Sequence, residues 1–330
     1  LSHNLSNICS KKIVSFVFPC RTLSSTMLQN STQDRYMEAV VRSFIFVLFG
    51  TIINSINGVL VFTFFRSSIF YSDPRYILYI HLVINDTLMV FFSVTLSVMS
   101  YAWPKVPFPF CVILLIIAAA TYNNTPLTLA GMAVERYIAI CKPLHHHQIC
   151  TVRRTYILIS LIWGVSVLPG LTDLIIIVIV RPLSVFTTST LCSSTNVYNT
   201  PYNEELSKVK NSLYLSVVWV ILVFTYCQVL IAARRASADK SSAKKAQSTI
   251  LLHGAQLLLC MLSYITDKIF LPLVTDQQKR ISFFNYLLTN IVPQLLTPLI
   301  YGVRDKHFYN HRKGFYSCKL PVVKVEPSKQ

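Results

Sequence analysis

Charged residues are scarce in this sequence, and acidic residues are the scarcest. Of its 330 residues only 13 are Asp or Glu, and charges of both signs make up 13% of the chain, whereas an average soluble domain is about one-quarter charged. The hydrophobic fraction is 53% and the mean hydropathy is +0.52. So few charges cannot cover a water-facing surface. The composition therefore favours a protein whose apolar surface lies in a lipid bilayer.

The patterns on which enzymes and metal sites depend are also missing. No Ser, His and Asp set and no paired carboxylates stand together in the apolar segments, so we expect neither an enzyme nor a cofactor. The nine cysteines include no CxxC pair, which argues against a zinc ribbon or a dense disulfide scaffold. The histidines from His145 to His147 could bind a metal ion, but consecutive residues on a short loop point in different directions, and we predict no metal site there.

Seven stretches of the sequence are long and apolar enough to cross a bilayer, which takes about 20 helical residues. They are 39–65, 76–100, 110–134, 156–180, 212–233, 248–270 and 281–302. Their apolar runs are continuous and do not alternate, which argues against a β-barrel. Backbone groups in hydrocarbon must bond within their own segment, so each stretch is predicted to be a helix. We therefore expect an all-α membrane protein built as a seven-helix bundle.

Basic residues set the orientation of this bundle. With the N-terminus outside, most Lys and Arg fall in the inner loops and the tail, as positive-inside topology requires. The net charge of +17 then reflects topology, and no nucleic-acid partner is expected. We expect an extracellular segment at 1–38, a membrane domain at 39–302 and a cytoplasmic tail at 303–330. Residues 1–26, which precede Met27, are interpreted as an upstream extension without a function.

Two segments outside the bundle carry candidate modification sites. Asn30 begins the sequence Asn-Ser-Thr on the outer side, where it is a candidate for glycosylation. The same pattern at Asn85 and Asn123 lies inside apolar segments and is rejected. A basic amphipathic stretch at 306–316 predicts a short helix after the seventh span. Cys318 follows it and is either palmitoylated or an ordinary cytosolic thiol.

Polar residues inside the apolar segments usually face the interior of a bundle, because they are unfavourable in hydrocarbon. Asn57 and Asp86 lie in the first two segments, and residues 121–125 form a polar band in the third. An ionised Asp86 needs a cation or several hydrogen-bond donors nearby. One hypothesis is a sodium site made by Asn57, Asp86 and Thr125, and the other is a protonated Asp86 in a hydrogen-bond network.

The inner end of the third segment carries the most specific pattern in the chain. Residues Met132 to Leu144 read MAVERYIAICKPL, with Glu135, Arg136 and Tyr137 at its centre. This run resembles the signature of vertebrate odorant receptors, a family of rhodopsin-like G-protein-coupled receptors, whose usual form is MA(Y/V/I)(D/E)RY(V/I)A(I/V)C.PL. The variants in this chain lean toward the fish-type branch of that family.

Two further stretches resemble the same family, each with one departure. Residues 245–253 resemble the motif KA..TC..H, but Ile250 stands where the motif has Cys. Residues 293–304 resemble P.LNP.IYG.R, but Thr297 stands where the motif has Asn. The second departure puts in doubt any ion site completed from the seventh helix. The resemblance as a whole covers residues 27–311.

The resemblance implies one covalent link and one landmark. Cys111 and Cys192 resemble the family's disulfide between the third helix and the second outer loop, on the oxidising side of the membrane. Trp163 matches the tryptophan of the fourth helix.

The resemblance also implies a mechanism at the plasma membrane. Glu135 would hold Arg136 at rest and release it toward a heterotrimeric G protein of the olfactory stimulatory type, when the inner ends of helices 3, 5 and 6 separate. A ligand would drive this change by binding one of two states better. The residues expected to take part in coupling are Glu135, Arg136, Tyr137, Tyr226, His253 and Tyr301. The alternative is that Arg136 merely anchors its helix at the membrane surface.

The small odorant ligand is expected to bind between helices, where apolar walls and a few polar groups form a pocket. The candidate residues are Tyr122, Asn123, Tyr214, Tyr264 and Lys268. Each could instead hold neighbouring helices together. A rhodopsin-like receptor for another small ligand is the nearest alternative function. A seven-helix transporter is a weaker one, because the sequence shows neither internal repeats nor pairs of broken helices.

Overall fold

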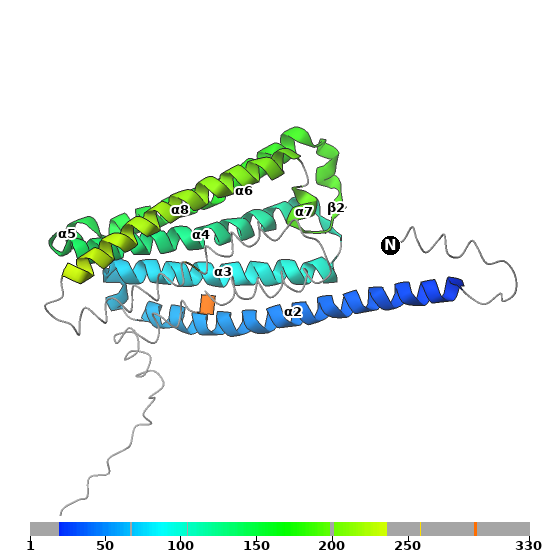
Figure 1. Ribbon diagram of the computed structural model, residues 1–330, viewed down its shortest axis with the longest axis horizontal. Helices are drawn as coiled ribbons and strands as arrows, with labels where there is room; N and C mark the ends of the chain where they lie inside the picture. The colour runs from blue at the N-terminus through cyan, green and yellow to red at the C-terminus, as the bar shows by residue number, and fades with distance from the viewer. Residues whose placement is uncertain are drawn as a thin grey trace, which may run out of the picture. The chain divides into compact units, whose positions relative to one another are not determined.

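The computed structural model describes residues 20–66, 68–103, 105–198 and 201–235, together with Leu258, Gln294 and Leu295. Its elements are α2 (Cys20–Arg66), η1 (Ser68–Ser72), α3 (Pro74–Ala102), β1 (Val106–Pro107), α4 (Phe108–Cys141), α5 (Pro143–Ile149), α6 (Val152–Val180), η2 (Leu183–Thr187), β2 (Ser189–Thr190), α7 (Ser194–Val197) and α8 (Pro201–Arg235), drawn in Figure 1. The predicted segments 248–270 and 281–302, apart from those three single residues, lie outside this described part.

The chain divides into two compact units, 1–45 and 46–330, and α2 runs from the first into the second. In the first unit the described residues, 20–45, are all helical. Asn30 therefore lies within a helix. The packing described below concerns the second unit alone.

Five of the described helices are long and apolar enough to span a membrane. Their apolar spans are Ser43–Arg66, Pro74–Ser100, Phe108–Cys141, Val152–Val180 and Glu205–Ala232. They confirm the first five predicted segments. The helices are longer than the apolar runs: α4 continues to Cys141 and α8 begins at Pro201. Apolar composition marks only the hydrocarbon layer, whereas helical hydrogen bonding continues into the interfacial layers.

The local sequence explains where α3, α5 and α6 begin. Asp73 caps α3 by accepting a hydrogen bond from the backbone N–H of Arg75 at 3.0 Å, and Pro74 takes the first helical position. Thr151 caps α6 in the same way through the N–H of Arg154. Pro143 opens α5 directly after α4, so the second inner loop is itself a short helix.

Helix α4 lies at the centre of the described bundle, in contact with α3, α6 and α8 (Figure 1). Contacts also join α3 to α6 and α6 to α8. A cluster of buried side chains from four helices fills the inner half. It includes Leu60, Phe64, Leu78, Leu82, Leu129, Met132, Val218 and Leu222. Helix α4 contributes Leu129, Ala130 and Met132 to this cluster, and several of its polar residues are also buried.

The outer end of the bundle carries the only β-structure among the described residues. Val106 pairs with Thr190, and Pro107 with Ser189, in a two-stranded antiparallel ribbon. This ribbon adds a small strand pair to the all-α prediction. It ties the segment before α4 to the loop that follows α6.

Helices α4 and α6 approach each other closely at Gly170. A Cβ atom at this position would lie 3.1 Å from Cγ2 of Ile116 and 3.3 Å from its Cγ1. Small residues allow such close helix contacts in membranes. Gly164, on the same helix, has nothing within 4 Å of the equivalent position.

The substitution Gly170→Val should destabilise the bundle, because the branched side chain must push Ile116 away. Overpacking of this kind costs about 1–3 kcal/mol. We expect a lower melting temperature of the purified protein and reduced expression at the membrane surface. Gly164→Val is the control, since it makes the same change of helix propensity in open space. Equal losses in both variants would contradict the close-contact explanation.

Candidate functional site

The inner end of α4 places Glu135 among polar partners from two elements. The Glu135 side chain is only 6% exposed. Its Oε1 lies 2.9 Å from Nε2 of His146 on α5, and its Oε2 lies 4.0 Å from Nε of Arg136. The contact of Glu135 with Arg136 is thus at the outer limit of an ion pair, and the contact with His146 is much the shorter. Arg136 is half-buried at this inner surface.

Other inner-end contacts connect α4 to α8. The ring of Tyr137 packs edge-on against Phe224, with ring centroids 5.9 Å apart. The thiol of Cys141 lies 3.7 Å from the carbonyl oxygen of Gln228. Tyr226 is half-buried on the same stretch of α8. Separation of α8 from α4 at this end would break these contacts.

Asp73 and Arg75 form a second charged pair at this inner face. Nη2 of Arg75 lies 2.5 Å from Oδ2 of Asp73. Partial burial opposes ionisation of Asp73, but hydrogen bonds from Arg75 and the positive charges of Arg75 and His146 outweigh it and lower the pKa of the carboxyl. Asp73 is therefore a fixed negative charge near neutral pH, beside the loop that carries His146.

The polar band of α4 meets α3 in the middle of the bundle. Nδ2 of Asn85 donates to the carbonyl oxygen of Thr121 at 3.0 Å and to Oγ1 of Thr125 at 2.9 Å. The hydroxyl of Thr125 then donates to Oδ1 of Asp86 at 3.1 Å. Asp86 is 1% exposed, and Asn57 of α2 is equally buried. The side-chain amide of Asn57 has no hydrogen-bond partner among the residues that the structure describes.

Neighbouring helices contact backbone carbonyls of α4 in the turn before Pro126. Pro126 lies inside the helix and has no N–H, so the carbonyl of Tyr122 cannot receive the usual bond from the next turn. The carbonyls on either side are used by neighbouring helices. Asn85 donates to that of Thr121, and the hydroxyl of Tyr214 on α8 donates to that of Asn123. The turn before Pro126 is thus held from both α3 and α8.

A second polar chain, which the sequence analysis missed, links α6, α3 and α4. Nε1 of Trp163 lies 3.0 Å from Nε2 of His81, and Nδ1 of His81 lies 3.3 Å from Oγ1 of Thr128. An indole N–H can only donate, so Nε2 accepts and the proton of the neutral ring is on Nδ1. Thr128 in turn donates to Oδ1 of Asn124 at 2.8 Å. His81 could have been noticed as a polar residue in an apolar segment.

The outer half holds an ion pair between α6 and α8 that the sequence analysis also missed. Nζ of Lys210 lies 2.5 Å from Oδ1 of Asp173, 3.0 Å from Oγ1 of Thr172 and 3.2 Å from the carbonyl oxygen of Pro169. These three acceptors match the three donors of an ammonium group. Both charged side chains are 19% exposed. Charges inside a membrane are tolerated when they are paired in this way.

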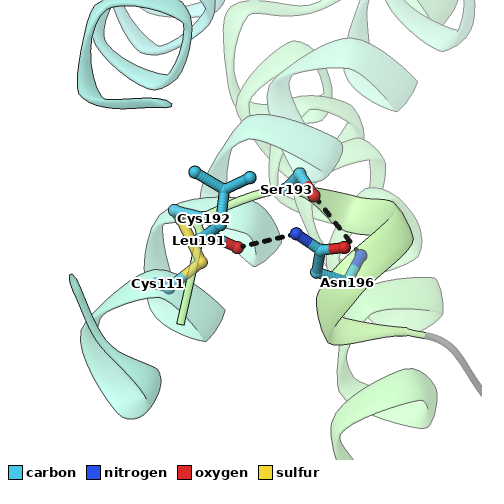
Figure 2. Close-up of a disulfide and its surroundings, with 5 residues drawn as sticks. All are labelled: Cys111, Leu191, Cys192, Ser193 and Asn196. Atoms are coloured by element: carbon cyan, nitrogen blue, oxygen red, sulfur yellow. Dashed lines mark hydrogen bonds between the residues drawn. A yellow bond between two sulfur atoms is a disulfide. The ribbon is translucent and has the colours of Figure 1, made fainter. Parts of the chain in front are cut away.

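The disulfide between Cys111 and Cys192 closes the outer end, as the resemblance implies (Figure 2). The loop beyond it turns into α7 at Ser193, whose hydroxyl accepts from the backbone N–H of Asn196. Nδ2 of Asn196 donates back to the carbonyl oxygen of Leu191 at 3.4 Å. Both cysteines are buried in an apolar cluster with residues such as Val106, Leu115, Ile177 and Val197.

Tyr198 lies just after α7 and reaches toward the outer ion pair. Burial and the negative charge of Asp173 raise the pKa of this phenol to about 12. The hydroxyl therefore stays neutral at any physiological pH. Tyr198 therefore adds no negative charge beside the Asp173–Lys210 ion pair.

Several predicted site residues lie outside the described part of the chain: His253, Tyr264, Lys268, Tyr301 and Cys318. Of the ligand candidates that are described, Tyr214 and Asn123 are joined by a hydrogen bond, and Tyr122 is half-buried beside them in sequence. Among the described residues no group of three or more His, Cys, Asp or Glu side chains could hold a metal ion.

Comparison with known proteins gives one consistent result. Residues 56–301 match the family described as 7 transmembrane receptor (rhodopsin family). The chain is 34% identical to "Odorant receptor 131-2" of Danio rerio over 82% of this chain and 85% of that relative. It is 27% identical to "Olfactory receptor 4K1" of Homo sapiens over 80% and 86%, and 26% identical to the human "Olfactory receptor 4F5" over 81% and 88%.

The variant Lys210→Met should destabilise the folded protein, because it leaves the Asp173 carboxylate without its cation. Breaking a largely buried pair from one side costs about 3 kcal/mol. The melting temperature of the purified protein is the measurement. Adding Asp173→Asn to Lys210→Met should recover part of the loss. Lys105→Met, which removes an exposed lysine, is the control; a loss as large in this control would contradict the ion-pair explanation.

Replacing Cys111 or Cys192 by Ala should sharply reduce surface expression, since the outer loop loses its covalent tether to α4. Removing a native disulfide typically costs 2–5 kcal/mol. Flow cytometry of an N-terminal tag measures the surface fraction. Cys227→Ala, which removes an exposed free cysteine, should have little effect. Detection of Cys111 and Cys192 as free thiols in surface-expressed protein would rule out the disulfide.

Proposed function

The chain belongs to the rhodopsin family of seven-transmembrane receptors and is an odorant receptor of the plasma membrane, and from that premise we propose that Glu135 and Arg136 form its switch. Proteins of this family are receptors rather than enzymes, and they act on heterotrimeric G proteins. The observation that carries the proposal is the MAVERYIAICKPL run at the inner end of α4, with the Glu135 carboxylate buried between Arg136 and His146.

In the proposed mechanism the receptor has two states and the odorant binds one of them better. At rest, Glu135 holds the guanidinium of Arg136 at the inner face. When the inner ends of the helices separate, Arg136 is released toward the G protein. Arginine suits this role because it keeps its charge and presents a fork of donors. Tyr137 supports the proposal, because its contact with Phe224 joins α4 to a helix that must move.

Three further coupling residues are proposed from the resemblance: Tyr226, His253 and Tyr301. Tyr226 lies on the stretch of α8 that contacts α4 at its inner end. We also propose that the G protein is of the olfactory stimulatory type.

We propose that the odorant binds in the outer half of the bundle, between α4, α8 and the predicted helix 248–270. The contact of Tyr214 with the Asn123 carbonyl supports this placement, because it puts polar groups at an interface between two helices. Tyr122 lies in the same turn of α4. Tyr264 and Lys268 would complete the pocket from the third side.

Asp86, Thr125 and Asn57 are the residues proposed to hold a sodium ion. They fit a hard cation, because each supplies oxygen and because the buried Asn57 amide has no other partner among the described residues. A bound cation would offset the charge of Asp86 inside the bundle. In its absence, the same carboxyl group is stabilised by the hydrogen bond from Thr125, whose hydroxyl accepts in turn from the amide of Asn85.

The proposed organisation places residues 1–38 outside the cell, 39–302 in the membrane and 303–330 in the cytosol. Asn30 is the proposed glycosylation site, and Cys318 is a candidate for palmitoylation.

The variants Arg136→Ala and Glu135→Gln should act in opposite directions. Arg136→Ala should abolish the cAMP response to an odorant found by panel screening, while odorant binding is retained. Glu135→Gln should raise basal cAMP about tenfold, because loss of the carboxylate removes ~1–2 kcal/mol from the resting state. Basal and odorant-driven cAMP in transfected cells are the measurements.

Surface expression is the control for both variants, because misfolding alone would silence each of them. If both variants reach the surface and signal like the parent, Arg136 is only a membrane anchor and the proposed switch is wrong.

A further inference from the structure

Among the residues that the structure describes, the closest partner of the Glu135 carboxylate is a histidine of the second inner loop and not the neighbouring arginine. The His146 contact is 2.9 Å and the Arg136 contact is 4.0 Å, and they use different oxygens of the carboxylate. Both side chains of the shorter contact are shielded from water, with His146 15% exposed and Glu135 6%. The orientation of Glu135 toward Arg136 is therefore set from α5.

Only the middle histidine of the three can make this contact. Successive residues on a helix point about 100° apart, so one of three neighbours faces a given side. His146 is half-buried against α4, whereas His145 and His147 are exposed. The ring of His147 packs edge-on against that of His146 at 5.5 Å. The other two histidines thus offer matched controls in the same loop.

Charged and titratable groups surround this contact from four elements. Arg136 comes from α4, Asp73 and Arg75 from the start of α3, Cys150 from the end of α5 and Arg154 from the start of α6. The pKa of Asp73 is lowered, chiefly by its bonds to Arg75 against the effect of burial. The pKa of the Cys150 thiol is raised by burial and by the charge of Glu135. Arginine stays charged in proteins.

Around neutral pH these neighbours therefore keep their charge states. Imidazole is the side chain whose charge ordinarily changes between pH 5 and 8. Among the described residues around this contact, the loop histidines carry the kind of side chain that can change its charge in this range.

We propose that His146 is a positioning residue for the Glu135–Arg136 switch and makes the resting state depend on cytosolic pH. The proposal rests on the switch role given to Arg136 above. A protonated His146 turns its hydrogen bond with Glu135 into an ion pair, and charge-assisted bonds are the stronger kind. The carboxylate is then held more firmly in the orientation that faces Arg136.

Acidification favours whichever of the two receptor states binds a proton on His146 more tightly. The ion pair exists only while Glu135 and His146 are in contact, which is the resting arrangement. The resting state therefore gains stability when His146 binds a proton and loses that stability when the proton leaves as the pH rises. Basal signalling should fall when the cytosol is acidified.

The experiment measures basal cAMP of the full-length receptor in cells whose cytosolic pH is clamped at about 6 and about 7.5, on either side of the imidazole midpoint. No odorant is needed. Values are divided by surface expression and by the response to a direct activator of adenylyl cyclase at each pH. The parent should signal roughly threefold less at the lower pH. His145→Gln and His147→Gln should keep that response.

His146→Gln should lose the pH response, because Gln can still donate to Glu135 but does not titrate. His146→Ala should give the same basal cAMP at both pH values, roughly threefold above that of the parent at the higher pH, since both the donor and the titrating group are gone. If His146→Ala does not reach the surface, His146→Gln carries the test alone. A parent without a pH response, a His146→Gln variant that keeps it, or a His147→Gln variant that loses it would each overturn the proposal.

Glu135→Gln and Arg136→Ala, measured in parallel, separate this inference from the switch on which it rests. If Glu135→Gln raises basal cAMP while His146→Gln keeps the parent's pH response, the switch stands and only the role of His146 is wrong. If neither Glu135→Gln nor Arg136→Ala changes signalling, the switch itself is wrong.

Discussion

A polar group that faces hydrocarbon without a partner is strongly unfavourable, and this constraint shapes the described bundle around α4. The third span contains Thr121, Asn124, Thr125 and Thr128, all of them buried. Each needs partners that lipid cannot supply. Asn85 and Asp86 of α3 meet this need on one side, and His81 extends it to Trp163 of α6. The helices are thus ordered by their hydrogen bonds as well as by apolar packing.

The same constraint explains why proline is tolerated in the middle of α4. Pro126 removes one backbone donor, but the carbonyls around Tyr122 lie at contacts with other helices rather than toward lipid. Asn85 and Tyr214 donate to two of them. On α6 the carbonyl of Pro169 is used similarly, by Lys210. Irregular backbone in this bundle therefore coincides with polar contacts between helices.

Features that depend on neighbouring residues could be predicted from the sequence, whereas contacts between distant residues could not. Apolar runs located the five described spans, because a span is a continuous property of about 20 residues. The partnership of Cys111 and Cys192 came from the family resemblance, which carries information that spacing alone does not. Trp163 was recognised as a landmark, but His81, its partner 82 positions away, was not. Nothing in a single sequence states that two polar residues on different helices lie at the same depth.

The His146 contact illustrates the same limit at short range. His146 lies only 11 positions after Glu135, and both were noted in the sequence, yet the histidines were considered only for metal binding. The missing information was that Pro143 starts a new helix, which turns one histidine of the three back toward α4.

The two ends of α4 are secured by bonds of very different strength. At the outer end a covalent disulfide ties the loop to α4 and does not open by thermal motion alone, and a short strand pair adds hydrogen bonds beside it. At the inner end the helix is held by ion pairs, hydrogen bonds and ring contacts, which each open at a free-energy difference of about 1–2 kcal/mol. Thermal fluctuations of the surrounding elements must therefore grow in amplitude from the outer face to the inner face. A bundle with this gradient of stiffness moves about its outer end, and small displacements there become large ones where the cytosol begins.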